Sequence, residues 1–284
     1  VEKVDRKSML IRESGRSTDF ISPSFGHGCL YNCSYCYMKR HKPTGLNVAT
    51  NTTDILDAMW NHHNKLGDKI PNQTHDEYWT YDISCNEDFV LHLKHHDWGK
   101  IFDFFRDTDL YASMATKYVN FKLLEYNPKN KVRVRMSLMP EEFRKVLEPN
   151  TSSISERILF INKLLVAGYD VHVNFSPVIV TPGALALYED LFKMLDAGVQ
   201  EEFKDRVKAE VIFLTHNEKK HLDNLSNELP GEDLLWRPDM QEVKTSQYGG
   251  KNLRYKWKLK KQLVKEFKQL HNQVIPWNTI RYIF

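Results

Sequence analysis

Three of the four cysteines lie in one short segment. Cys29, Cys33 and Cys36 form a Cys-x3-Cys-x2-Cys sequence, and the aromatic residue Tyr37 follows directly. Thiolates are soft ligands that bind zinc and iron–sulfur clusters. Three closely spaced cysteines can hold three iron corners of a [4Fe–4S] cubane, which leaves the fourth iron without a protein ligand. A small molecule with an amine and a carboxylate can chelate that iron, so the spacing predicts an open-corner cluster.

A structural zinc site is the competing interpretation of these cysteines. Zinc would need a fourth ligand to complete its tetrahedron, and His27 or His41 would supply it. Structural zinc sites more often use paired Cys-x2-Cys knuckles, and only Cys33 and Cys36 form such a pair. Four cysteines in 284 residues are too few for a disulfide scaffold, and their grouping indicates metal binding in a reducing, cytoplasmic compartment.

The elements that position this loop alternate between strands and helices. Six strands are predicted at residues 20–25, 78–83, 110–116, 132–138, 171–180 and 209–215, and helices at 53–66, 89–106, 155–167, 184–195 and 218–229. Such repeats predict a parallel sheet with right-handed crossovers. The expected fold is an α/β open partial (β/α)6 barrel over residues 20–230, and a doubly wound sheet is the alternative. Residues 1–19 form an N-terminal extension, and residues 231–284 a C-terminal one.

The fourth cysteine, Cys85, follows the second predicted strand. The cluster loop follows the first strand, and sites in barrels and open sheets gather at the carboxyl ends of parallel strands. We therefore expect Cys85 on the same face as the loop, although a lone cysteine is more often a small core residue. The histidine pairs at 62–63 and 95–96 are expected at the surface, because neighbouring helical side chains point about 100° apart and cannot chelate one ion.

Charge is unevenly distributed along the chain. The net charge is +3, from 40 Lys and Arg against 37 Asp and Glu, but residues 243–284 hold ten of the basic residues and one acid, Glu266. The rest of the chain is therefore acidic. A basic hairpin with its turn at 247–250, a helix at 259–271 and an edge strand at 278–284 are predicted here. Basic residues interleaved with aromatic ones favour nucleic acid as the partner, and a merely solvated basic helix is the alternative.

A membrane protein and a disordered chain are both excluded as classes. No apolar run approaches the roughly 18–20 residues that span a bilayer. The apolar content of 41% and the charged content of 27% are those of a chain that buries a large core.

The cysteine loop resembles the signature of the radical S-adenosylmethionine (SAM) superfamily. From about residue 22 to 284 the chain is similar to one family within it, the spore photoproduct lyases. The resembling segments are residues 35–37, 83–88, 116–117, 135–137, 148–153, 167–169, 216, 248–249 and 276–284. The resemblance implies the partial-barrel fold with a C-terminal hairpin and helix, a [4Fe–4S] cluster, bound SAM and a DNA substrate.

The resemblance also implies roles for individual residues. The implied cluster ligands are Cys29, Cys33 and Cys36. The implied hydrogen donor is Cys85, with Tyr35 and Tyr37 as relay residues. The implied SAM contacts are Tyr37, Lys117, Ser137 and Glu87, and the implied DNA contacts are Lys244, Tyr248, Arg254 and His216. An electron donor such as flavodoxin or ferredoxin is implied as a partner, and a monomer is expected. Two positions depart from the family pattern. Glu87 replaces a serine that helps to position SAM, and residues 245–247 lack the Trp-Gly-Arg type of run.

The expected activity is that of a carbon–carbon lyase in DNA repair. It reverses 5-thyminyl-5,6-dihydrothymine, a thymine photolesion, to two thymines through hydrogen abstraction by a 5′-deoxyadenosyl radical. One alternative keeps this chemistry but acts on another thymine-derived base or nucleotide, as the departure at Glu87 would allow. The other is a non-catalytic, zinc-bearing nucleic-acid-binding protein.

Overall fold

A single large sheet forms the centre of the molecule. The computed structural model describes residues 1–245 and 249–284. The sheet has eight strands in the order β2-β3-β6-β7-β8-β9-β10-β14. All neighbours are parallel except the β2–β3 pair. The strands are β2 (Arg12–Glu13), β3 (Phe20–Ile21), β6 (Trp79–Asp82), β7 (Leu110–Thr116), β8 (Val132–Leu138), β9 (Asp170–Val178), β10 (Ala209–Phe213) and β14 (Ile280–Ile283).

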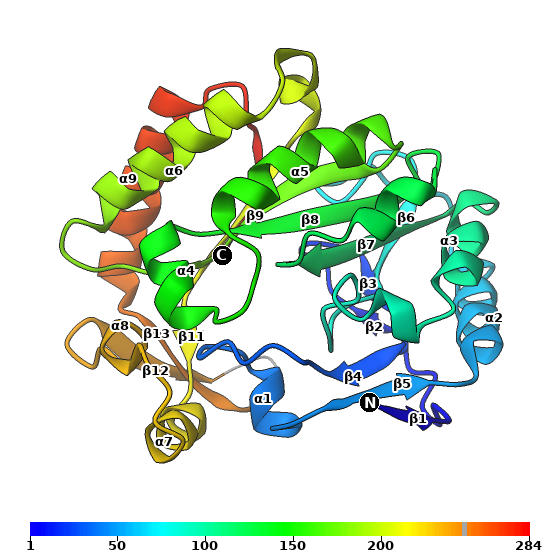
Figure 1. Ribbon diagram of the computed structural model, residues 1–284, viewed down its shortest axis with the longest axis horizontal. Helices are drawn as coiled ribbons and strands as arrows, with labels where there is room; N and C mark the ends of the chain where they lie inside the picture. The colour runs from blue at the N-terminus through cyan, green and yellow to red at the C-terminus, as the bar shows by residue number, and fades with distance from the viewer. Residues whose placement is uncertain (246–248) are drawn as a thin grey trace.

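The order of the strands confirms the open partial barrel. The six predicted strands correspond to β3, β6, β7, β8, β9 and β10, which are adjacent in the sheet in the order of the sequence. A doubly wound sheet would reverse direction at one point, so that alternative is wrong. All seven residues of β8 are buried, as expected for a parallel strand covered on both faces. The sheet curls without closing, and Figure 1 shows α1 across the opening from β8 and β9.

Helices between the strands cover the outer face of the sheet. Four of those predicted are α2 (Thr52–His63), α3 (Trp98–Arg106), α5 (Ile154–Val166) and α6 (Ala184–Gly198). The fifth, α7 (Glu218–Ser226), lies against α1 and α8 instead. Helix α5 begins at a capping box in which Ser153 and Glu156 exchange hydrogen bonds. It ends before Gly168, whose φ of +95° and contact with Asn127 leave no space for a side chain. Figure 1 shows α5 lying along β8 and β9.

The predicted helix at 89–106 is wrong in its first half. Residues 89–97 form turns and a short 3-10 helix, η1 (Leu93–His95), and α3 begins only at Trp98. In this segment the backbone N–H groups of His95 and His96 bond to carbonyls three residues back, as in a 3-10 helix, and the His92 and His96 rings turn to the Glu87 carboxylate. The expectation of a surface position for the 95–96 pair is also wrong for His96. Its side chain is 2% exposed and lies against the Glu87 carboxylate.

Two small sheets flank the main one. The first, in the order β1-β5-β4, contains β1 (Glu2–Val4), β5 (Leu46–Ala49) and β4 (Gly26–Gly28); the second, in the order β11-β13-β12, contains β11 (Thr215–His216), β13 (Lys251–Tyr255) and β12 (Gln241–Thr245). The last predicted strand, 209–215, is therefore divided between two sheets, whereas only residues 20–21 of the first predicted strand, 20–25, are in a strand. Pro23 interrupts the first predicted strand, because it has no N–H to donate to the ladder.

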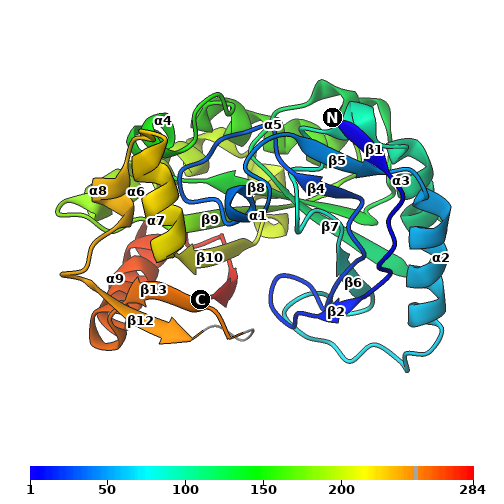
Figure 2. The ribbon, with the colours of Figure 1, turned by 90° about the horizontal axis from the view of Figure 1, so that it is seen from below.

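The C-terminal segment forms the hairpin, helix and edge strand predicted for it. Strands β12 and β13 pair antiparallel, and of the predicted turn residues, 247 and 248 lie outside the described part of the chain. Figure 2 shows this hairpin on one side of the barrel, with β2 and β6 on the other. Strand β14 pairs in parallel with β10 at the edge of the main sheet. The remaining helices are α1 (Met38–His41), α4 (Glu141–Leu147), α8 (Glu232–Leu235), α9 (Trp257–Val274), η2 (Phe121–Glu125) and η3 (Glu201–Arg206).

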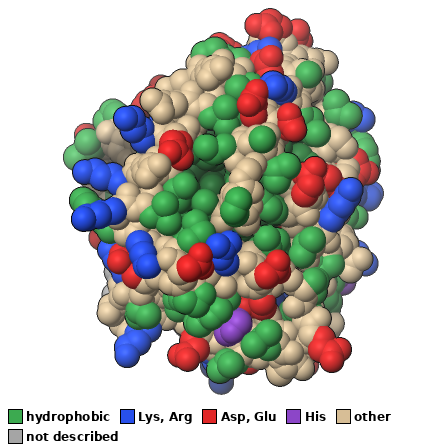
Figure 3. Space-filling view, turned by 90° about the vertical axis from the view of Figure 1, so that its left-hand side faces the viewer, with side chains coloured by type: hydrophobic (Ala, Val, Ile, Leu, Met, Phe, Trp, Pro, Cys, Tyr) green, Lys and Arg blue, Asp and Glu red, His purple; other side chains and the backbone are tan. Residues whose placement is uncertain are grey.

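Helix α9 is fixed to the barrel by its apolar side. The Phe267 ring packs edge-on against Tyr188 and Phe192 of α6, with 5.4 Å between ring centroids in each pair. A hollow of about 260 Å³ remains between the two helices, lined mainly by apolar side chains. Figure 3 shows hydrophobic side chains gathered on this side of the molecule among charges of both signs. None of the helices among the described residues is both long and apolar enough to span a bilayer.

Candidate active site

The three loop cysteines lie between β4 and α1, in a segment that a glycine turn and two hydrogen bonds hold in place. Gly28 has a φ of +112°, and a Cβ atom there would lie 2.5 Å from the Gly45 carbonyl, so the turn into the loop requires glycine. The Lys39 ammonium donates to the Cys29 carbonyl at 2.6 Å. Between the second and third cysteines, the Ser34 carbonyl accepts from the Asn224 amide at 2.8 Å. These contacts fix the loop from both sides.

All three thiols line one cavity of about 420 Å³. The other walls come from the carboxyl ends of successive parallel strands. Cys85 follows β6, Lys117 follows β7, Ser137 lies near the end of β8, and Ser176 lies near the end of β9. The cavity is within the size range of small-molecule sites. The main sheet therefore brings Cys85 and two of the predicted SAM contacts to one face. The three-cysteine loop reaches the same cavity from β4, a strand of the small sheet, and not from the first barrel strand as predicted.

The arrangement of the thiols fits a cluster better than a zinc ion. Three thiolates on one tetrahedral zinc would lie about 3.8 Å from one another. Among the described residues, no group of three metal-ligating atoms within 4.8 Å of one another contains a cysteine, so at least one pair of these sulfur atoms is farther apart. His27 and His41, the fourth zinc ligands considered from the sequence, line a different cavity. At least one separation between two of these sulfur atoms is thus wider than a single tetrahedral zinc ion allows.

Cys85 and Tyr37 meet at the cavity wall. The Tyr37 hydroxyl donates to the Cys85 carbonyl, and its oxygen lies 3.6 Å from the Cys85 sulfur. Although 47% of the Tyr37 surface is exposed, its hydroxyl end is enclosed by these contacts. Burial raises the pKa of the Cys85 thiol, and the Asp82 carboxylate raises it further. The thiol is therefore protonated at neutral pH and has a hydrogen atom to give.

Tyr35 occupies another part of the same cavity. Its hydroxyl donates to one oxygen of Glu148, and the Arg157 guanidinium holds the other oxygen at 2.8 Å. Arg157 also donates to the Ser137 carbonyl at 2.8 Å and is fully buried. Arg157 could not be predicted as a site residue, because a single arginine in a helix is usually a surface residue. The structure places Tyr37, not Tyr35, in contact with Cys85.

Lys117 presents a positive charge to this part of the cavity. Its ammonium lies 5.7 Å from the centre of the Tyr35 ring. Burial lowers the pKa of Lys117, but the Glu148 carboxylate and other nearby anions outweigh burial and leave the pKa raised. The side chain therefore stays protonated. A buried ammonium at the cavity wall suits the carboxylate of an amino acid.

Glu87 is held by two histidines on the opposite wall. One carboxylate oxygen lies 2.9 Å from His92 Nδ1 and 2.9 Å from His96 Nε2. The other oxygen is buried and has no hydrogen-bond partner among the described residues. The His96 and His92 charges and hydrogen bonds outweigh burial and lower the pKa of Glu87, so the group is ionised. One anionic oxygen is thus left over at a residue that lines the cavity.

The predicted DNA contacts that the structure describes do not lie together at the cavity, unlike the predicted SAM contacts. Lys244 on β12 is partly exposed, with its ammonium 3.5 Å from the Glu242 carboxylate, and Arg254 on β13 pairs with Thr215, which lines the cavity. His216 is 2% exposed and bonds to Glu232. Tyr248 lies outside the described residues. The structure therefore brings Arg254 close to the cavity mouth, leaves Lys244 partly open to solvent and encloses His216.

Two further cations, Arg16 and Lys260, lie next to Arg254 of this hairpin. Arg16, Arg254 and Lys260 lie 4.4, 4.9 and 4.5 Å from the centre of the Phe284 ring. Burial lowers the pKa of Lys260, and the like charges of Arg254, Lys244 and Arg16 lower it further. Arg16 belongs to the N-terminal extension, and its sequence context gave no reason to place it here. We call Arg16, Lys244, Arg254 and Lys260 the basic cluster.

A half-barrel whose strand ends and three-cysteine loop face one cavity is the architecture of the radical SAM fold. The spore photoproduct lyase family model matches residues 4–284, and the chain belongs to this family. It is thus homologous to a radical SAM enzyme. A spore photoproduct lyase of Clostridium acetobutylicum is 25% identical over 237 residues, which cover 76% of this chain and 68% of that protein.

Solved structures of spore photoproduct lyase share the fold. The enzyme complexed with dinucleoside spore photoproduct has a TM-score of 0.87 and 22% identity, and the match covers 99% of this chain and 82% of that one. A double mutant with bound AdoMet and dinucleoside spore photoproduct has a TM-score of 0.88 and 21% identity over 99% and 82% of the two chains. AdoMet is SAM. The resemblance identified from the sequence is therefore confirmed at the level of family and fold.

Proposed function

We propose that this protein is a radical SAM lyase that repairs 5-thyminyl-5,6-dihydrothymine in DNA. The observation that carries the proposal is the distance of 3.6 Å between the Tyr37 hydroxyl oxygen and the Cys85 sulfur. Both residues line the cavity that the three loop cysteines also line. A hydrogen donor and its partner are thus placed beside a metal-binding loop. The family membership supports the same class of reaction.

The residues of the cavity suit the two groups that this chemistry needs. Cys29, Cys33 and Cys36 would hold a [4Fe–4S] cluster. The Lys117 ammonium would hold the SAM carboxylate beside Ser137, and the free oxygen of Glu87 would accept from the SAM amine. When bound, cluster and SAM supply a 5′-deoxyadenosyl radical that takes a hydrogen atom from the lesion.

The protein's own residues then carry hydrogen atoms. Cys85 gives the hydrogen of its S–H bond to the thymine radical left when the methylene bridge of the lesion breaks, and a thiyl radical remains on its sulfur. Tyr37 gives its phenolic hydrogen to this sulfur, which restores the thiol. Tyr35 is the second relay residue and gives its phenolic hydrogen to the Tyr37 oxygen radical. The hydrogen atom that restores Tyr35 comes from 5′-deoxyadenosine. Tyr35's bond to Glu148 fixes its ring in the wall, so Tyr37 acts first.

The basic cluster supports DNA as the partner. Its four cations lie beside the hairpin that pairs with Thr215 at the cavity, and the Arg254 Nε is buried with no partner among the residues described. A phosphate would supply the missing acceptor. A damaged dinucleotide step leaves the stack more easily than an intact one, which allows it to reach the cavity.

Replacement of Lys244 and Arg254 together by alanine tests this DNA contact. The slope of log K against log salt for an irradiated duplex should decrease in magnitude by about 1–2, because each lost phosphate contact removes roughly 0.9. Fluorescence anisotropy at several salt concentrations measures the slope. Lys193→Ala, an exposed lysine on α6, is the matched control and should leave the slope unchanged. An unchanged slope in the double variant would place the DNA elsewhere.

An electron donor such as flavodoxin or ferredoxin has a suitable face on the other side of the loop. Cys29 lines the active-site cavity and also a second cavity of about 590 Å³. The second cavity is bordered by Lys39, Arg40, Lys219 and Lys220. A partner with an acidic surface would be attracted there and come within reach of the cluster.

Anaerobic incubation with SAM, dithionite and ultraviolet-irradiated dry DNA tests the proposed activity. Repair should yield two adjacent, unlinked thymines in place of the lesion, and mass spectrometry of the digested DNA measures them. Formation of 5′-deoxyadenosine without repair would favour the alternative substrate, a different thymine-derived base or nucleotide. The feature that favours this alternative is Glu87, which lines the cavity where the family pattern has a serine and whose buried carboxylate is held by His92 and His96. The alternative of a zinc-bearing nucleic-acid-binding protein has less support, because His27 and His41, the two candidates for the fourth zinc ligand, line another cavity.

The buried pair of Arg157 and Glu148 supports the cavity wall, and its loss should destabilise the fold. Both side chains are 0% exposed and lie 2.8 Å apart. Arg157→Ala leaves the Glu148 charge uncompensated, so the free energy of unfolding should fall by about 3–5 kcal/mol. Urea unfolding followed by circular dichroism measures the change. The control Lys193→Ala removes an exposed pair with Glu189 and should cost less than about 1 kcal/mol; equal losses in both variants would contradict the expectation.

A further inference from the structure

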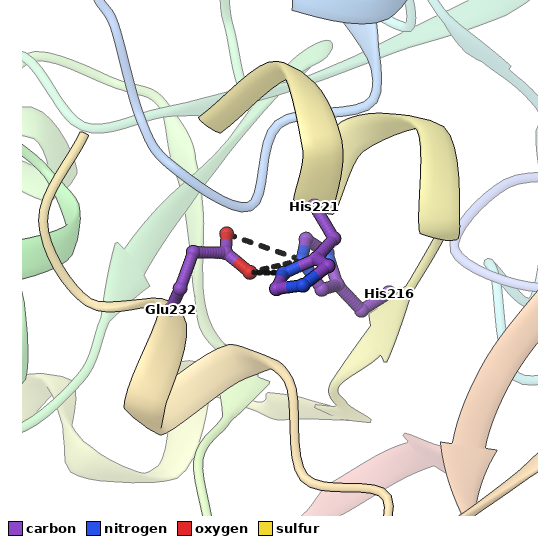
Figure 4. Close-up of side chains that lie close together, drawn as sticks. All are labelled: His216, His221 and Glu232. Carbon is purple, nitrogen blue, oxygen red and sulfur yellow. Dashed lines mark hydrogen bonds and ion pairs between the residues drawn. The ribbon is translucent and has the colours of Figure 1, made fainter. Parts of the chain in front are cut away.

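Two histidines and a glutamate from three elements meet away from the cysteines. His216 lies on β11, His221 on α7 and Glu232 at the start of α8, and Figure 4 shows both imidazole rings directed at the carboxylate. Their ligand atoms all lie within 4.8 Å of one another. This is the only group of three or more metal-ligating side chains this close together in residues 1–245 and 249–284. We call it the histidine–glutamate group.

The distances from His216 to the carboxylate are close to those between ligands of one small cation, whereas His221 lies at a short hydrogen-bond distance from it. His216 Nε2 lies 3.3 and 3.1 Å from the two Glu232 oxygens, and His221 Nδ1 lies 2.5 Å from one of them. Nitrogen and oxygen ligands of a tetrahedral zinc ion are about 3.3 Å apart, since each is about 2.0–2.1 Å from the metal. The His216 nitrogen and both carboxylate oxygens therefore need to move little to bind a metal.

The surroundings of the group are closed and rich in acceptors. His216 and Glu232 are 2% and 9% exposed, and the Trp236 ring stacks on His221 with 4.1 Å between centroids. Asn224, which is fully buried, donates to Glu232, as residues that orient a metal-bound carboxylate do. The Asn224 Oδ1 atom has no hydrogen-bond partner among the described residues. A cation would balance this excess of acceptor atoms.

We propose that His216, His221 and Glu232 bind one Zn²⁺ ion with a structural role. Two imidazole nitrogens and a carboxylate are a donor set that zinc accepts, with a fourth position left for water. The site would tie β11, α7 and α8 together. It would also reach the cluster loop, because Asn224 donates both to Glu232 and to the Ser34 carbonyl between Cys33 and Cys36. The proposal does not depend on which lesion the enzyme repairs.

Metal analysis of the full-length protein with its cluster reconstituted tests this site. The protein is treated with Zn²⁺ alone, desalted and analysed for zinc and iron by mass spectrometry. The wild type should retain about one zinc per chain. Glu232→Gln keeps the shape but loses the charge, and His221→Ala removes a half-buried ligand; both should lose at least tenfold in zinc occupancy at unchanged iron content. Thermal unfolding supplies a second readout, in which Zn²⁺ raises the Tm of the wild type only.

The matched control is His95→Ala, a histidine outside the group on η1. It should bind zinc and respond in Tm as the wild type does. Because iron content is measured in the same samples, a misfolded variant or zinc in empty cluster sites is recognised separately. The proposal is overturned if the wild type retains no more zinc than Glu232→Gln, or if Glu232→Gln and His221→Ala both bind zinc as the wild type does.

Discussion

The Cys85→Ala variant should cleave SAM but fail to complete repair. Alanine has no S–H bond, so the thymine radical formed when the lesion opens finds no donor at the position where Cys85 now lies, 3.6 Å from the Tyr37 oxygen. The yield of repaired thymines should fall at least about tenfold, equivalent to about 1.4 kcal/mol or more in the barrier of this step. Products of quenching by other molecules should appear instead. Mass spectrometry of the digested DNA measures both.

Cys85→Ser is the companion variant for this prediction. Serine is nearly isosteric, but its O–H bond is much stronger than S–H, so it should not rescue repair. Tyr37→Phe should complete a first turnover with Cys85 intact and then stall, because the thiyl radical has lost its nearest hydroxyl. Normal repair by Cys85→Ala would show that another group donates the hydrogen atom.

Replacing Cys33 or Cys36 by alanine should abolish iron binding and SAM cleavage. With only two thiolates left, the loop cannot hold three corners of a cubane, and we expect iron and acid-labile sulfide to fall to background after reconstitution. Formation of 5′-deoxyadenosine under dithionite should fall with them. Both quantities are measured on the same anaerobic sample.

The fourth cysteine provides the control within the same chain. Cys85→Ala removes one thiol from the same cavity but should keep the iron content of the wild type, because Cys85 follows β6 and not the cluster loop. If Cys85→Ala loses iron as Cys36→Ala does, Cys85 is a cluster ligand and cannot be the hydrogen donor.

Most of the barrel could be predicted because its strands have strong local patterns. The predicted strands at 110–116 and 132–138 agree with β7 and β8 at both ends. The first is a largely apolar run, and in the second apolar residues alternate with polar ones, which is the period of a strand. Residues 89–97 could not be predicted in the same way. Their apolar spacing resembles a helix, but His92 and His96 turn to the Glu87 carboxylate, and such contacts between side chains are not part of the local sequence pattern.

The site shows the same limit. The cysteine loop and Cys85 could be placed at one face because their positions relative to strands are a property of the sequence. The partners of Glu148 could not be predicted. Tyr35 is more than a hundred residues away from it in the sequence, and Arg157 reaches it from helix α5. The burial of His216 could not be predicted from the sequence either, since Glu232 contacts it from a separate short helix, α8.

The central claim is that three cysteines hold a cluster whose fourth iron is free to bind SAM. The electron paramagnetic resonance spectrum of the dithionite-reduced protein, recorded with and without SAM, tests it most directly. We predict a signal from a reduced [4Fe–4S] cluster whose g-values change on addition of SAM, because a new amine and carboxylate bind the open iron. A colourless protein with zinc and no such signal, or a cluster signal that SAM leaves unchanged, would contradict the claim.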